Sequence, residues 1–370
     1  MNKWMKRNKV KLIMYSNINF GDDLFLEILL TRYPLTKFVI HAPKIYKKTL
    51  TKYKNLIVYP SNTFVIKIVN SLLRIFTKKN INEIITNRVA DMIIIIGGSM
   101  FNQGGRKWKY SQDGCNNIFF FKKPTYLIGC NFGPFNDPQY LNEHLGLFRN
   151  FKDVCFRDIY SYKLFETNKN SRYANDIAFN YVPEHTLNIE NSVFISVINL
   201  RNRKNISLYH EDYIQKIVEI INEFTGKGYS IKLASFCKTE GDEDSISEIL
   251  SSCKLNLNAK IMINVIYYRG DTLEIISAIA ISKFVLATRF HAFVIGLVHN
   301  KIVFPIIYDE KISKVIDDNV PSINRIFIQD IKKLDPVNLV NFFENSEHIE
   351  IKRIIDNSKN QFKLLDEVLK

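Results

Sequence analysis

An arginine and a histidine stand two residues apart where an apolar run gives way to a helical pattern. Arg289 and His291 follow the run 284–286 and precede the pattern 292–298. A strand-to-helix turn lets both side chains reach one ligand beside the positive end of the helix. Arginine binds phosphate or carboxylate groups, and histidine transfers protons near neutral pH. A lone histidine is more often structural, but this pairing at this position indicates a catalytic site.

Two glycines and a serine follow another apolar run. Gly97, Gly98 and Ser99 come directly after residues 91–96. Glycines after a buried strand allow a ligand to approach the backbone closely, and Ser99 with free amides can hold an anion. The alternative is that the glycines serve only the packing of strand against helix. The loop lacks the Gly-x-Gly-x-x-Gly spacing and the acidic residue of a dinucleotide site, which disfavours a nicotinamide cofactor.

The first loop of the chain, residues 16–23, ends in two aspartates. Gly21 permits a tight turn, and Asp22 and Asp23 precede the helical pattern 24–30. Either aspartate can cap the N-terminus of that helix. A cap explains one aspartate but not the neighbouring asparagines of the loop, so Asp22 is equally a candidate base in a polar site.

Two arginines follow other predicted strands. Arg157 can bind a phosphate or a carboxylate, or it can form a structural ion pair with Asp158 or Asp176. Arg201 begins a short segment with two further cations after the strand that opens the second half of the chain. Three cations at a strand end are a candidate cradle for an anion.

Short apolar runs alternate with helical patterns along the whole chain, which is typical of parallel sheets covered by helices. A polar stretch at 180–191, which contains Pro183, is the predicted linker between two halves. The sequence therefore predicts an α/β protein with two Rossmann-like domains facing a cleft. The predicted strands are 10–15, 37–41, 55–59, 91–96, 125–130 and 153–157 in the first half, and 192–199, 230–236, 260–267, 284–287 and 301–307 in the second.

The predicted domains cover residues 1–180 and 191–335, followed by C-terminal helices at 336–370. Those helices are predicted at 336–343 and 349–369, and the last is a candidate to pack back onto the first domain. Ligands of open α/β sheets lie outside the carboxyl ends of the strands. Tyr308 and Lys311 follow a buried strand and are therefore predicted to face the same cleft.

Composition narrows the partners and the compartment. The formal net charge is +14, which favours an anionic partner, but the basic residues are scattered and no nucleic-acid-binding motif appears, so nucleic acid is disfavoured. No apolar run is long enough to span a bilayer, and we expect no signal peptide. Five widely spaced cysteines show no disulfide or zinc spacing, which fits a cytoplasmic protein without a metal site.

Taken in order along the chain, the motifs described above resemble the polysaccharide pyruvyl transferase family. The likeness covers about residues 10–315, and each motif alone is weak while the ordered set is specific. The chain departs from many relatives at Ile96, where they carry a third glycine. The motifs are Gly21-Asp22-Asp23, Gly97-Gly98-Ser99, Arg157-Asp158-x-x-Ser161, Asp176-Ile177-Ala178-Phe179, Arg289-x-His291-Ala292 and Tyr308-x-x-Lys311.

The resemblance implies a glycosyltransferase-B-like fold and a pyruvyl (ketal) transferase. The donor would be phosphoenolpyruvate, bound on the side of the second domain, and the acceptor a glycan or lipid-linked sugar on the side of the first. The product would belong to an exopolysaccharide, a capsule or a cell wall, and no cofactor would be needed. We expect Arg289, supported by Arg157 and Arg201, to anchor the donor, His291 to act as general acid or base, and Asp22 to act as base toward the sugar.

Two other functions compete with this interpretation. A nucleotide-sugar-dependent glycosyltransferase of the same fold would need an acidic residue for the ribose, which Glu310 can supply. A non-catalytic partner in polysaccharide assembly would have no need for the pair Arg289 and His291. The sequence does not indicate the acceptor sugar, the ketal position or the oligomeric state.

Residues 64–79 form a predicted basic amphipathic helix. Apolar residues recur there at helical spacing, and Lys67, Arg74 and Lys78 fall on the opposite face. Most helices of this kind simply face a core. The alternative is a peripheral contact with the cytoplasmic face of the membrane, because anionic lipids attract lysine and arginine.

Overall fold

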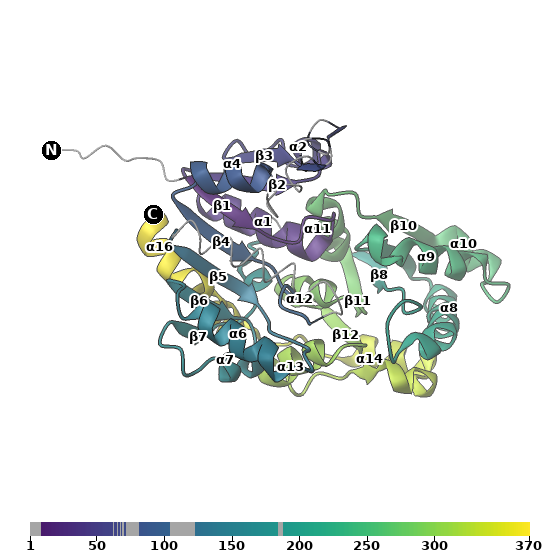
Figure 1. Ribbon diagram of the computed structural model, residues 1–370. Coiled ribbons are helices and arrows are strands. Elements are labelled where there is room, and N and C mark those ends of the chain that lie inside the picture. Colours follow the sequence, from purple (N-terminus) through teal and green to yellow (C-terminus); the bar gives the residue numbers. More distant parts are fainter. Residues whose placement is uncertain are drawn as a thin grey trace. The chain divides into compact units, whose positions relative to one another are not determined.

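The computed structural model describes residues 9–61, 63–64, 66, 68, 70–71, 81–103, 123–183 and 188–370. The chain forms two compact units (Figure 1). The first comprises the chain up to Asn17, Asp22–Ile177 and Asp356–Lys370, and the second comprises Ile18–Gly21 and Ala178–Ile355. The four residues Ile18–Gly21 thus belong to the second unit, although the chain on either side of them belongs to the first.

The first unit is built on a parallel sheet of seven strands in the order β3-β2-β1-β4-β5-β6-β7. Its central strand β4 is apolar and fully buried because helices cover both faces of a parallel sheet. The strands are β1 (Lys9–Ile13), β2 (Lys37–Ala42), β3 (Leu56–Pro60), β4 (Met92–Ile96), β5 (Thr125–Cys130), β6 (Asp153–Phe156) and β7 (Ser171–Tyr173). The helices are α1 (Phe20–Arg32), α2 (Ile45–Thr49), α4 (Ile81–Val89), α6 (Pro138–Phe148), α7 (Ile159–Leu164) and α16 (Lys363–Leu369). The helix α15 (Lys352–Ser358) begins in the second unit and ends in the first, and the first two residues of α1 belong to the second unit.

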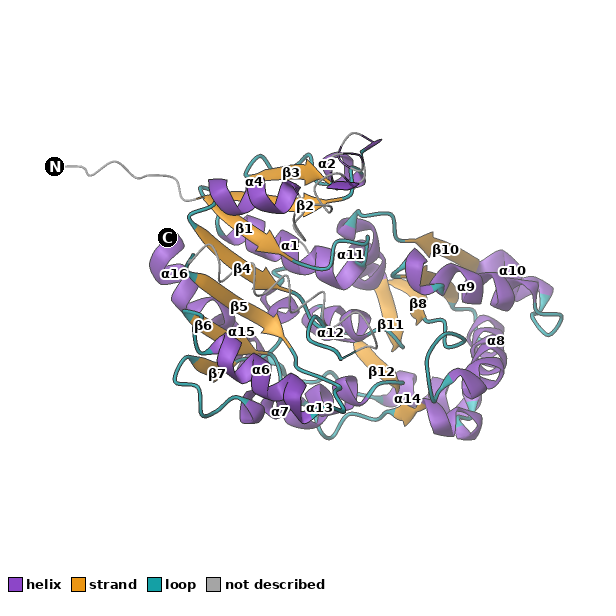
Figure 2. Ribbon diagram, in the orientation of Figure 1, coloured by secondary structure: helices purple, strands orange, loops and turns teal. Residues whose placement is uncertain are grey.

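The second unit repeats the scheme with six parallel strands in the order β10-β9-β8-β11-β12-β13. Figure 2 shows each sheet as a row of strands with helices packed around it. The strands are β8 (Glu190–Val197), β9 (Ser230–Ser235), β10 (Ile263–Tyr267), β11 (Ser282–Ala287), β12 (Ile302–Ile307) and β13 (Ile326–Phe327). The helices are α8 (His210–Gly226), α9 (Asp242–Ser251), α10 (Leu257–Met262), α11 (Thr272–Ile281), α12 (Phe290–Val298), α13 (Glu310–Asn319) and α14 (Pro336–Asn345).

The structure confirms the α/β class and the two Rossmann-like domains. In both sheets the chain starts near the middle, at β1 or β8, runs to one edge and then returns to build the other edge. The point where the strand order reverses lies between β1 and β4 in the first sheet and between β8 and β11 in the second. Such switch points leave a crevice at the carboxyl ends of the strands, where α/β proteins bind their ligands.

Two predicted boundaries need correction. The strand predicted at 260–267 begins only at Ile263, because residues 257–262 form the short helix α10. Neither aspartate caps α1, since that helix begins at Phe20 and both lie within its first turn. The Asn19 side chain accepts the backbone N–H of Gly21 at 3.0 Å instead and caps the helix.

The helix predicted at 349–369 is broken into α15, a 3₁₀ turn at Lys359–Phe362, and α16. Gln361 lies in that turn and is fully buried within the first unit. Its side chain accepts the N–H of Gly129 at 2.9 Å and donates to the carbonyls of Ala174 at 2.7 Å and Asn175 at 3.1 Å. A glutamine that satisfies buried backbone groups fixes the C-terminal segment to this unit.

The predicted amphipathic helix at 64–79 falls largely outside the described residues. Those described within it, Phe64, Ile66, Ile68, Asn70 and Ser71, are helical. No helix among the described ranges is long and apolar enough to cross a membrane.

Candidate functional site

The backbone around Arg289 is held by a buried serine. The N–H groups of Thr288 and Arg289 both donate to Ser196 Oγ, each at 3.0 Å, and Ser196 lies on the adjacent strand β8. The turn from β11 to α12 is thereby fixed to the centre of the second sheet. Arg289 is 7% exposed and occupies the N-cap position of α12.

Two carboxylates bind the Arg289 guanidinium. Its Nη1 lies 2.7 Å from Glu240 Oε2, and its Nη2 bonds the carboxylate of Asp242. Asp242 is fully buried, and its second oxygen accepts the N–H groups of Phe236 at 2.9 Å and Cys237 at 3.0 Å. Burial alone would lower the pKa of Arg289, but the charges of Asp242 and Glu240 outweigh it and raise that pKa. Asp242 therefore sets the orientation of Arg289.

Glu240 is shared between two arginines. The same oxygen, Oε2, lies 2.6 Å from Arg203 Nη2, and the other oxygen accepts Asn19 Nδ2 at 3.3 Å. Burial tends to raise the pKa of Glu240, yet Arg289 and Arg203 lower it below its usual value. The group of Arg289, Arg203, Glu240 and Asp242 has no net charge, two cations against two anions. The side chains of Glu240 and Arg203 are 29% and 27% exposed, so solvent and ligands can reach these two members of the group, whereas Arg289 and Asp242 are buried.

Tyr308 lies beside the same arginines. The Arg203 guanidinium carbon stands 5.0 Å from the centre of the Tyr308 ring, a cation–π contact. Burial raises the pKa of Tyr308 against the lowering effect of both arginines, so its hydroxyl stays protonated at neutral pH. The Lys311 side chain lies outside the described side chains. Glu310 starts α13 with its side chain 90% exposed, 3.8 Å from Lys314.

His291 is partly buried on the first turn of α12, against a glycine. A Cβ built on Gly21 would lie 2.0 Å from His291 Nδ1 and 2.2 Å from Cε1. Any side chain at position 21 would therefore displace the imidazole. Gly21 belongs to the second unit, together with Phe20, whose N–H donates to the carbonyl of Phe236 at 3.1 Å.

The residues predicted in the first unit also gather at strand ends. Arg157 is 6% exposed, and its Nη1 lies 2.9 Å from Asp176 Oδ2, the structural ion pair weighed from the sequence. Its Nη2 donates to Asn131 Oδ1 at 2.8 Å, an oxygen that also accepts the Ser99 hydroxyl at 3.2 Å. A Cβ on Gly98 would lie 2.8 Å from Arg157 Nη1. Gly98 is therefore a glycine because the guanidinium packs on its backbone.

Asp22 lies close to Gly97, which precedes Gly98 in the same loop. A Cβ on Gly97 would lie 3.4 Å from Asp22 Oδ1, which places the carboxylate beside the loop that follows β4. Asp22 is partly buried, whereas Asp23 is fully buried and accepts the hydroxyl of Tyr46 at 2.7 Å. Asp23 is therefore structural, and Asp22 is the more exposed of the two aspartates.

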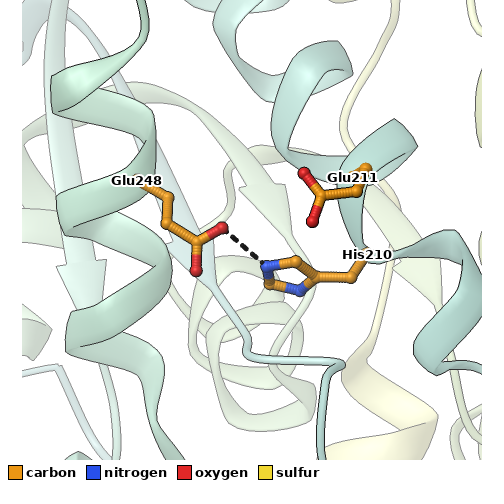
Figure 3. Close-up of side chains that lie close together, drawn as sticks. All are labelled: His210, Glu211 and Glu248. Carbon is orange, nitrogen blue, oxygen red and sulfur yellow. Dashed lines mark hydrogen bonds and ion pairs between the residues drawn. The ribbon is translucent and has the colours of Figure 1, made fainter.

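Arg201 lies in a different cluster, with His210, Glu211 and Glu248, the three side chains that Figure 3 shows. Its Nη2 stands 2.7 Å from Glu211 Oε1 and 2.8 Å from Glu248 Oε2, and His210 Nε2 lies 3.0 Å from the same glutamate oxygen. The ligand atoms of His210, Glu211 and Glu248 lie within 4.8 Å of one another, a spacing that a metal ion can bridge. Since two carboxylates already bind Arg201, this position offers no net positive charge to an anion.

Several contacts of the site join residues that are far apart in the sequence. Glu240 and Asp242 are 49 and 47 residues before Arg289, and Asn19 is 221 residues from Glu240. Asn131 follows β5 without any motif. Each of these residues follows a strand of a parallel sheet, at the edge where ligands of α/β sheets bind. Their positions after strands could therefore have marked them as candidates.

The sequence profile of polysaccharide pyruvyl transferases matches residues 19–310. The chain belongs to this family. The match covers most of the chain, including the loop at Gly21 and the turn that carries Arg289 and His291. Membership makes the protein a transferase of polysaccharide biosynthesis. No curated protein matches the chain in a sequence search.

Solved structures show the same fold at low identity. A UDP-GlcNAc 2-epimerase from Methanocaldococcus jannaschii aligns with a TM-score of 0.56 and 12% identity, over 97% of this chain and 99% of the other. The Anabaena protein HepE, solved with UDP and glucose, has a TM-score of 0.56 and 12% identity over 98% and 99% of the chains. A glycosyltransferase from Rickettsia africae has a TM-score of 0.53 and 10% identity over 99% and 98%. The fold of this pyruvyl transferase family member is therefore glycosyltransferase-B-like.

Proposed function

We propose that this protein transfers the pyruvyl group of phosphoenolpyruvate to two hydroxyls of one sugar, as a ketal, in a precursor of an exopolysaccharide, capsule or cell-wall glycan. The observation that carries the proposal is the family match across the turn that contains Arg289 and His291. The second unit would bind the donor and the first the acceptor, a glycan or a lipid-linked sugar. The reaction needs no cofactor or metal, and the enzyme would work in the cytoplasm.

The chemistry requires proton transfers and an anion site. A proton is added to the methylene carbon of the donor, and a sugar hydroxyl attacks the neighbouring carbon, which has become electrophilic. The bond from that carbon to the phosphate oxygen breaks, and a second hydroxyl closes the ring. One hydroxyl proton ends on the new methyl group and the other leaves with phosphate. A base must accept hydroxyl protons, and fixed cations must hold the departing phosphate.

The contacts in the second unit suit the donor. Arg289 is fixed by buried Asp242, whereas Glu240 is partly exposed and binds both Arg289 and Arg203. We infer that the donor's phosphate or carboxylate replaces the Glu240 carboxylate on these arginines. The arginines are thus kept paired and in place before the donor arrives, which reduces the cost of ordering them on binding.

The remaining roles follow the positions of the side chains. His291, held against Gly21, is the proposed general acid or base, and Asp22 is the proposed base toward the acceptor hydroxyl. Arg157, paired with Asp176, and Ser99 would shape the acceptor side. Tyr308 would donate a hydrogen bond from its hydroxyl to the donor, and Lys311 keeps its sequence-based assignment as a further anion ligand. Arg201, bound by Glu211 and Glu248, would take no part in donor binding.

We expect the variant Glu240→Gln to bind phosphoenolpyruvate more tightly. Glutamine keeps the size of the side chain but removes the charge that competes with the donor for Arg289 and Arg203. Hydrogen bonds to charged groups contribute roughly 1.5–3 kcal/mol, so KM for the donor should fall about tenfold while kcat changes little. Steady-state kinetics measure both. Glu248→Gln is the matched control, since Glu248 is similarly exposed and also pairs with an arginine. A higher KM in Glu240→Gln alone would mean that Glu240 contacts the substrate itself.

Phosphoenolpyruvate should raise the melting temperature of the purified protein. A ligand that binds only the folded state stabilises it by mass action, by about 2.7 kcal/mol at a hundred times its Kd. Differential scanning fluorimetry with phosphoenolpyruvate, inorganic phosphate and UDP-sugars tests the donor directly. A shift with UDP-sugars and none with phosphoenolpyruvate would favour the nucleotide-sugar glycosyltransferase and overturn the proposal.

A further inference from the structure

The short helix α10 presents two large apolar side chains to solvent. Ile261 is 84% exposed and Leu257 is 79% exposed, more than any other large apolar side chain among the described residues. They are four residues apart, so they lie on the same face of the helix. Scattered exposed apolar residues are common, but an adjacent pair at this exposure marks a contact surface.

The opposite face of α10 is anchored in the core of the second unit. Ala259 of α10 is fully buried, and Leu255, two residues before the helix, is 5% exposed. Both belong to the hydrophobic cluster that includes the buried side chains of α8. Asn222 of α8 donates to the carbonyl of Lys254 at 2.8 Å and accepts the N–H of Asn256 at 3.1 Å. The exposure of Leu257 and Ile261 therefore belongs to a helix that is held in place.

Two exposed lysines lie close to the pair along the chain. Lys254 and Lys260 are exposed on either side of Leu257, and no acidic residue occurs between Glu248 and Asp271. Glu219 of α8 lies within electrostatic reach of Lys254, but it is bound by Lys216 at 2.6 Å. Exposed apolar side chains flanked by lysines match the chemistry of an anionic lipid surface, which takes both kinds of side chain at its interface.

The position of α10 within its unit leaves this face open. The helix leads into β10, which is the edge strand of the second sheet. Figure 1 shows α10 at the end of the second unit, beyond α9, with no other described element of that unit over its outer side. A flat lipid surface can reach a helix in this place without entering the strand-end site.

We propose that α10 is a membrane-docking element that inserts Leu257 and Ile261 into an anionic bilayer, with Lys254 and Lys260 at the headgroups. The docking itself is independent of the donor. Its purpose, to bring the enzyme to a lipid-linked acceptor, rests on the proposed function. The two apolar side chains would enter the apolar part of the bilayer, and each lysine near an anionic surface strengthens binding about fivefold.

Sedimentation of the full-length protein with vesicles tests the proposal. We expect the protein to sediment with phosphatidylglycerol-containing vesicles at low salt and much less with pure phosphatidylcholine. The variants Leu257→Ser with Ile261→Ser, and Lys254→Glu with Lys260→Glu, should each weaken binding at least tenfold. Leu35→Ser with Leu208→Ser is the matched control, because those leucines are 69% and 68% exposed elsewhere, and it should bind like the wild type.

Three outcomes would overturn the proposal. They are equal sedimentation of the wild type and both α10 variants, no sedimentation of the wild type, and a wild-type dimer in solution that Leu257→Ser with Ile261→Ser converts to a monomer. The last would make α10 an interface between copies of the chain. Because binding is measured without phosphoenolpyruvate, its failure leaves the proposed reaction untouched, and inactivity toward phosphoenolpyruvate leaves the docking result untouched.

Discussion

The variants His291→Ala and Arg289→Lys are expected to lose nearly all transferase activity while remaining folded. Loss of a general acid or base lowers the rate roughly a hundredfold to ten-thousandfold. Lysine retains the charge of Arg289 but not the planar guanidinium, which binds Glu240 through one nitrogen and Asp242 through another. Lysine is chosen over alanine because removing the whole cation would leave buried Asp242 unpaired, at a cost of about 3–5 kcal/mol in stability.

The measurement is the initial rate of phosphate release in the presence of acceptor, together with circular dichroism to confirm folding. His348→Ala is the control for the histidine, because His348 is exposed. Arg269→Lys is the control for the arginine, since Arg269 pairs with Glu243 at the surface of the same unit. Rates close to wild type in His291→Ala and Arg289→Lys would show that the turn with these two residues is not the catalytic site.

Gly21→Ala should impair catalysis almost as strongly, although it adds a single methyl group. The new Cβ would lie 2.0 Å from His291 Nδ1, well inside van der Waals contact, so the imidazole has to move. Misplacing a catalytic group by about 1 Å can cost a hundredfold in rate. We expect a loss of that order in kcat, with a smaller change in donor affinity, because Arg289 is held independently by Asp242.

Gly146→Ala is the matched control for Gly21→Ala. A Cβ on Gly146 meets no atom within 4 Å, and alanine favours the helix α6 in which it lies. This variant should be as active as the wild type and at least as stable. Wild-type kcat in Gly21→Ala would show that the position of His291 against Gly21 does not matter for the reaction.

The sequence predicted the elements well where local pattern decides the structure. The strand at Thr125–Cys130 was predicted with its true ends, and the strand predicted at 91–96 is observed at Met92–Ile96. β7 and β13 were missed, since two or three residues carry no readable periodicity. The last predicted helix is interrupted by the 3₁₀ turn that contains Gln361, and the buried hydrogen bonds of Gln361 reach residues far away in the chain.

The structure places Arg289 and His291 in the predicted strand-to-helix turn, but their contacts could not be predicted from the sequence. Arg289 and His291 could be located because both the turn and the residue types are local. The carboxylates that bind Arg289, and the glycine that holds His291, come from other strand ends and from the separate segment Ile18–Gly21. Only the fold brings such residues together, so spacing in the sequence cannot predict them. For the same reason, the sequence could not predict that Glu211 and Glu248 neutralise the charge of Arg201.

The most direct test of the central claim is to follow the carbon atoms of the donor. The purified protein is incubated with phosphoenolpyruvate labelled with ¹³C and a panel of glycosides and lipid-linked sugars with free neighbouring hydroxyls, and the products are analysed by mass spectrometry while phosphate is measured. We expect the label to appear in one acceptor as a ketal, with one phosphate released for each ketal formed and none released by His291→Ala. Transfer of a sugar from a UDP-sugar to the same acceptors, with phosphoenolpyruvate left intact, would contradict the account.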